Sequence, residues 1–83
     1  MSQTIAAAGN TEVPAYLTLI NLGYKVDRGR ESDYEPWIAE IGTLKLVAHD
    51  LLQLVGLSLL YRERANDWHA ADEEIEAFLA RFS

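Results

Sequence analysis

Residues 37–48 read Trp-Ile-Ala-Glu-Ile-Gly-Thr-Leu-Lys-Leu-Val-Ala, and this stretch decides the fold. Two runs of five mostly apolar residues flank Gly42-Thr43, which matches the Gly-X sequence of a two-residue type II′ hairpin turn. That turn fixes the register and places Glu40 opposite Lys45, a pair of opposite charges that contributes about 0.2–1 kcal/mol. The same register gathers apolar side chains on one face. We therefore predict an antiparallel β-hairpin with one buried face.

A helix and a third strand are predicted before the hairpin. Pro14 fits the first turn of a helix, and Gly23 fits the position just past its end. The residues between them are so uniformly apolar that a strand remains the alternative. Alternation over 23–27 predicts a short strand, and the polar segment 28–33 has the composition of a loop.

Two further helices are predicted after the hairpin. Asp50 can cap the first helix by accepting a backbone N–H bond, and Asn66-Asp67 ends it. The second begins near Asp72, and four apolar residues at i, i+3, i+4 and i+7 give it a narrow core-facing stripe: Ile75, Phe78, Leu79 and Phe82. The expected fold is α+β, with a helix, a three-stranded antiparallel sheet, and then two helices packed on one sheet face.

The first of these two helices, residues 51–64, is apolar over an unusually wide arc. At about 100° per residue, its apolar side chains cover roughly 220° of the helical wheel, whereas an ordinary surface helix has a stripe of about 100°. A central helix between a sheet and another helix would explain this width, and so would an interface. Leu60 is the most diagnostic residue because it lies within the polar arc. We predict four exposed or interfacial residues: Leu57, Leu60, Tyr61 and Arg64.

Gly56 lies in the middle of the same helix, where glycine costs about 1 kcal/mol relative to alanine. This cost is reasonable where a bulky group or another backbone approaches closely. We expect that neighbour to be Trp68 of the same chain or a second subunit.

Composition limits the class of protein. The chain has 83 residues, 49% of them hydrophobic, with a net charge of −6 and no cysteine. We expect a mobile tail over residues 1–11 and a single small domain over 12–83. The acidic balance argues against nucleic-acid or anionic-membrane partners and suits a basic protein partner. Without cysteine there is no disulfide framework, and no secretory signal or long apolar span is visible, so a cytoplasmic protein is expected.

Candidate catalytic and metal-binding residues are few. His49 and His69 have carboxylates nearby, but His69 and Glu73 share a helical i, i+4 spacing only if the helix begins before His69. Ser58 lies on the apolar face of its helix, where its hydroxyl can bond the carbonyl one turn back. Phosphate-loop and nucleophile-elbow motifs are absent from the sequence. We predict no catalytic residue, no metal site and no cofactor.

These observations favour a small acidic, non-enzymatic interaction or regulatory module that forms a homodimer. It would act through the apolar face of 51–64 and an acidic rim. One alternative is an antagonist that mimics nucleic-acid charge and blocks a basic protein. Another is a small-ligand or divalent-metal-binding protein that uses His49, His69 and nearby carboxylates.

Overall fold

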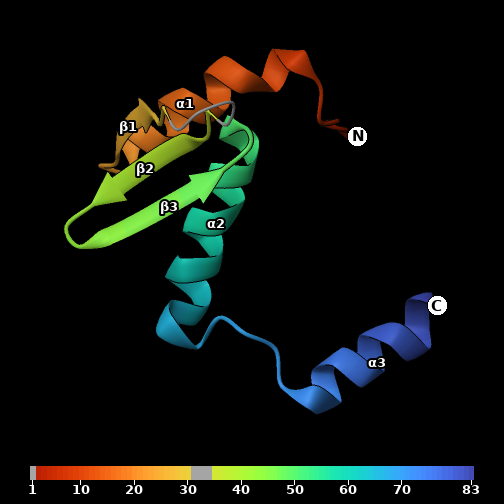
Figure 1. Cartoon of the computed structure of the whole chain (residues 1–83). Helices are drawn as coiled ribbons and strands as arrows, with labels where there is room; N and C mark the ends of the chain where they lie inside the picture. Colours follow the sequence, from red (N-terminus) through yellow and green to blue (C-terminus); the bar gives the residue numbers. More distant parts are fainter. Residues whose placement is uncertain (1, 31–34) are drawn as a thin grey trace.

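The computed structural model describes residues 2–30 and 35–83, and its elements follow the predicted order (Figure 1). A short 3-10 helix, η1, leads into α1, and a second one, η2, follows α2. The bounds are η1 Gly9–Thr11, α1 Glu12–Asn21, β1 Lys25–Arg28, β2 Trp37–Ile41, β3 Leu44–Ala48, α2 Leu51–Arg64, η2 Ala65–Asp67 and α3 Asp72–Phe82. The α+β class is therefore confirmed.

The three strands form one antiparallel sheet in the order β1-β2-β3, which makes β3 an edge strand. The predicted hairpin register is confirmed, with Glu40 opposite Lys45 and Ile41 opposite Leu44. Gly42 adopts a φ of 57°, in agreement with the positive φ that a type II′ turn requires at its first central residue.

The predicted helix before the sheet is confirmed, and glycine ends it as expected. Pro14 lies in the first turn of α1, and Gly23, just beyond the helix, has a φ of 100°. The amide of Tyr24 then donates to the Leu19 carbonyl at 3.0 Å, so the chain reverses tightly into β1. This reversal places α1 against β1.

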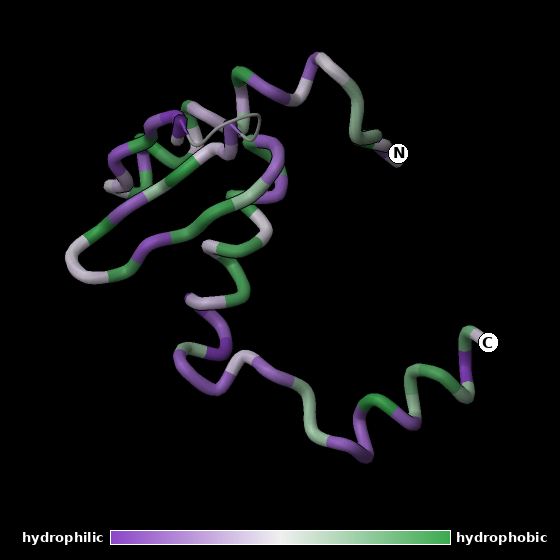
Figure 2. The backbone as a smooth tube through the Cα atoms, in the orientation of Figure 1, coloured by the Kyte–Doolittle hydropathy of each residue, from purple (hydrophilic) through white to green (hydrophobic). Residues whose placement is uncertain are grey.

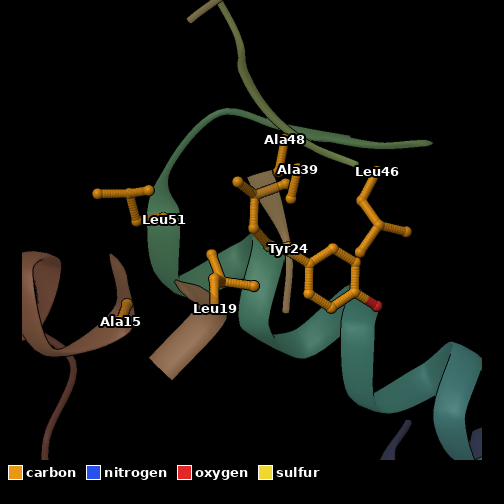
Figure 3. Close-up of a cluster of buried hydrophobic side chains, with 8 residues drawn as sticks. Ala15, Leu19, Tyr24, Ala39, Leu46, Ala48 and Leu51 are labelled. Atoms are coloured by element: carbon orange, nitrogen blue, oxygen red, sulfur yellow. The ribbon is translucent and has the colours of Figure 1, made fainter. Parts of the chain in front are cut away.

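The core lies between the sheet and the two helices α1 and α2 (Figure 3). α2 packs against α1 and also against β2 and β3, so it is central in the way that its wide apolar arc suggests. Leu19 and Leu54 are the largest fully buried side chains among the described residues. The whole buried cluster consists of Ala15, Leu19, Tyr24, Ala39, Leu46, Ala48, Leu51 and Leu54.

The polar groups at and within α2 behave as predicted. Asp50 Oδ1 accepts a hydrogen bond from the Gln53 amide at 2.7 Å and caps the helix. In return, Gln53 Oε1 accepts from the His49 amide at 3.0 Å. The buried Ser58 hydroxyl donates to the Val55 carbonyl at 2.7 Å, so its hydrogen-bonding capacity is used within the helix.

The position predicted for α3 is wrong in one respect, because its apolar stripe does not face the core. No residue of α3 is buried, and its stripe is exposed by 45% at Ile75, 61% at Phe78, 51% at Leu79 and 67% at Phe82. Figure 1 shows α3 well separated from the sheet. The 14-residue α2 is about 21 Å long at 1.5 Å per residue. Residues 59–64, its last turns, are all exposed and extend beyond the core.

Candidate interaction surface

The end of α2, η2 and α3 together form an exposed segment, residues 59–83, which we call the C-terminal arm. Every residue of the arm is exposed. Apolar positions nevertheless recur along it, as the hydropathy colouring of α3 in Figure 2 shows. Isolated apolar side chains on a surface are ordinary, but a regular stripe of large ones marks a contact surface.

The four residues predicted to be exposed or interfacial lie in different environments. Leu57 is half-buried and packs against the core. Leu60 and Tyr61 are exposed by 42% and 36%. Arg64 is exposed but holds contacts within its own chain. Leu60 and Tyr61 are therefore available to a partner, whereas Leu57 contributes mainly to the fold.

A groove runs between α2 and β3, along the edge of the sheet that β3 forms. It consists of two adjoining hollows of about 250 and 580 Å³, and both are lined by Val47, Leu57 and Leu60. Trp68 lines one hollow and Gly56 lines the other. We call this feature the β3–α2 groove, and its lining is mainly apolar.

Among the described residues, Gly56 has no close neighbour that would explain a glycine at this position. A Cβ atom built at this position meets nothing within 4 Å. Trp68, which is 49% exposed, therefore does not approach Gly56, and that part of the prediction is wrong. The absent side chain instead leaves the groove open at this point, so its cost of about 1 kcal/mol is not compensated within the described part of the chain.

Arg64 connects the last turn of α2 to the linker that leads to α3. Its Nε donates to the Trp68 carbonyl and its Nη2 to the His69 carbonyl, both at 3.1 Å. The same Nη2 lies 3.6 Å from Glu74 Oε1, which also accepts from the Ala71 amide at 2.8 Å. An exposed ion pair adds only about 0–1 kcal/mol, but the two carbonyl bonds tie the linker to the last turn of α2. Arg64 thus contacts both the linker and the first turn of α3.

A third hollow, of about 600 Å³, lies among α1, the hairpin tip and α2. Tyr24 and Tyr61 line it, together with Ser58 and Arg62 at the side of α2. Burial raises the pKa of the Tyr24 hydroxyl above its ordinary value, and the neighbouring Tyr61 raises it further. This hollow lies between the core and the first residues of the arm, Leu59, Tyr61 and Arg62.

The shifted pKa of Tyr24 predicts a loss of stability in alkaline solution. The folded protein holds the Tyr24 proton more tightly than the unfolded chain, whose tyrosine has a pKa of 10.0. This stabilisation is complete below pH 10.0 and is lost as the pH rises toward the higher folded value. We expect Tyr24→Phe to reduce the fall in unfolding free energy above that pH, as measured by urea denaturation. Tyr61→Phe should reduce it less, and an equal reduction would contradict burial as the main cause.

The two histidines are not brought together. His49 precedes α2 and His69 follows η2, so the length of α2 separates them. The His69 ring stacks on Trp68 with ring centroids 3.7 Å apart, and α3 begins only at Asp72, which removes the helical spacing with Glu73. Within residues 2–30 and 35–83, no group of three or more histidines and carboxylates is placed to hold a metal ion.

A second apolar stripe on α1 was not predicted. Val13, Tyr16, Leu17 and Ile20 are all exposed, and they recur at i, i+3, i+4 and i+7. The buried side of α1 carries Ala15 and Leu19. The apolar residues on two sides of α1 could have indicated this stripe, because the helix can bury only one of its sides against the domain.

Neither a protein-family model, nor a curated protein, nor a solved structure matches this chain. Among the described residues, no helix combines the length and the apolar character that crossing a membrane requires. The interpretation of the surface therefore depends on its own geometry.

Proposed function

We propose that the protein is a small non-enzymatic interaction module that works as a homodimer. The observation that carries this proposal is the C-terminal arm, whose large apolar side chains project from the domain without cover. A stable fold has no need of such an arm, whereas a binding surface needs apolar anchors surrounded by polar groups. The acidic residues at the start of α3 supply part of that polar rim.

Leu60 provides the test because it is exposed on α2 and lines the β3–α2 groove. We expect Leu60→Glu to convert a dimer into a monomer, since a carboxylate cannot be buried unpaired at an apolar contact. Light scattering after size exclusion, over a wide concentration range, measures this change. The unfolding free energy of the monomer should change by less than about 0.5 kcal/mol, as for an ordinary surface substitution.

Glu63→Gln is a suitable control on the same helix, because it changes one exposed residue outside the groove lining. The control should retain the dimer. A wild-type chain that stays monomeric at every concentration would overturn the proposal, and so would a Leu60→Glu variant that remains a dimer.

A further inference from the structure

The α3 stripe and the β3–α2 groove are two apolar surfaces of one chain that do not meet each other. The stripe consists of Ile75, Phe78, Leu79 and Phe82, and none of these is buried. We propose that α3 of one copy lies in the β3–α2 groove of a second copy, and that the exchange is reciprocal. This inference rests on the proposed homodimer and names the segments that form it.

The contacts of Arg64 favour a second copy over the chain's own groove. Its bonds to the Trp68 and His69 carbonyls fix the linker, and its ion pair with Glu74 reaches the first turn of α3. Ala65 adds a backbone turn with a φ of 53°. With these contacts in place, α3 extends away from its own domain (Figure 1). Docking on another copy leaves all of these contacts intact, whereas folding back would move α3 away from Arg64 and break its ion pair with Glu74.

The groove has the shape and the charge that α3 requires. Gly56 leaves space for close approach at one end, and Trp68 gives an apolar wall at the other. The described lining residues include Lys45 and no carboxylate. On the α3 wheel, at 100° per residue, Asp72 and Glu76 both lie beside the apolar stripe, on its Leu79 side. A cation beside the groove and carboxylates beside the stripe are complementary, which selects the register of docking more than its strength.

The exposed stripe supplies a large part of the area that a stable dimer buries. A large aromatic side chain has about 200 Å² of surface. With the exposed fractions given above, the stripe presents roughly 400 Å² on this scale. A reciprocal exchange buries two stripes, about 800 Å², together with the groove surface that they cover, whereas a standard specific interface buries about 1,200–2,000 Å² in total.

The test uses one variant of the arm and one variant of the groove in the full-length chain. Phe78→Glu places a charge in the stripe, and Gly56→Leu fills the groove. Each variant alone should weaken self-association at least about tenfold, as loss of a central apolar anchor does. Gly56→Leu should melt at or above the wild-type temperature at concentrations where both are monomeric, because leucine favours a helix and nothing lies within 4 Å of its Cβ position.

Mixing the two variants gives the decisive measurement. In a mixed dimer, the intact arm of Gly56→Leu can dock in the intact groove of Phe78→Glu. One of the two reciprocal contacts is then restored, so the mixture should associate. Neither variant can form that contact with itself. Ala77→Glu is the matched control, since it adds the same charge to α3 outside the stripe, and it should dimerise like the wild type.

The outcomes separate this inference from the proposed function. A dimer that survives Phe78→Glu but not Leu60→Glu overturns the arm exchange and leaves the interaction module standing. Two variants that stay monomeric when mixed also overturn the exchange. A monomeric wild type overturns both proposals. Dimerisation restored only in the mixture supports the exchange.

Discussion

Replacing Leu54 with alanine should lower the unfolding free energy by about 2–5 kcal/mol, the range for a leucine deleted from a packed core. Leu54 is fully buried, and Leu19 is the comparable side chain on α1. Small domains bury little surface, and a total stability of about 5–15 kcal/mol leaves a small margin. We therefore expect a substantial unfolded fraction at elevated temperature. Urea denaturation, followed by circular dichroism and tryptophan fluorescence, measures the loss.

Leu52→Ala is the matched control, because Leu52 lies two residues away on the same helix and is 38% exposed. The control should lose less than about 1 kcal/mol, since it leaves a much smaller cavity. Similar losses in the two variants would contradict the placement of α2 on the sheet. The slope of the unfolding free energy against urea concentration should be equal in the two variants. Equal slopes would show that both expose the same amount of surface when they unfold.

The hairpin could be predicted in detail because its determinants are local. Gly42 supplies the backbone conformation of the turn, and the turn alone decides that Glu40 pairs with Lys45. Asp50 is similar, since an N-cap is satisfied by an amide three residues away. In each case the residues that fix the structure are within a few positions of one another.

The arm could not be placed for the opposite reason. The spacing of Ile75, Phe78, Leu79 and Phe82 shows that α3 needs an apolar partner, but periodicity is the same whether that partner is the chain's own core or another surface. The decision came from the length of α2 and from the side-chain bonds of Arg64. The helix over 51–64 was predicted, but its extension past the core was not, and the Arg64 bonds have no recognisable pattern in the sequence.

The residues of the candidate surface were predicted only in part. Leu60 was identified because an apolar residue stood in the polar arc of its helix, and it is indeed exposed. Val47 was missed, because an apolar residue on the outer face of a strand is ordinary until the strand is known to be an edge. Gly56 drew attention by its cost in a helix, but the sequence could not distinguish Trp68 from a second subunit as its neighbour.

A chain that ends at Ala70, and therefore lacks α3, should keep the stability of the monomeric domain while it loses the dimer. No residue of α3 is buried, so its removal exposes little of the core. We expect the unfolding free energy of the monomer to change by less than about 0.5 kcal/mol. Sedimentation or light scattering should show a single species with the mass of a monomer.

In the truncated chain, the stability of the monomer depends on the core, whereas association depends on the exposed apolar surface. Each of the two can therefore change without the other. A marked loss of monomer stability would mean that α3 supports the domain through contacts other than those of its exposed stripe. A truncated chain that still dimerises would place the interface on other apolar surfaces, such as the outer stripe of α1: Val13, Tyr16, Leu17 and Ile20. Retained stability with lost association is the result that separates α3 from folding and assigns it to recognition.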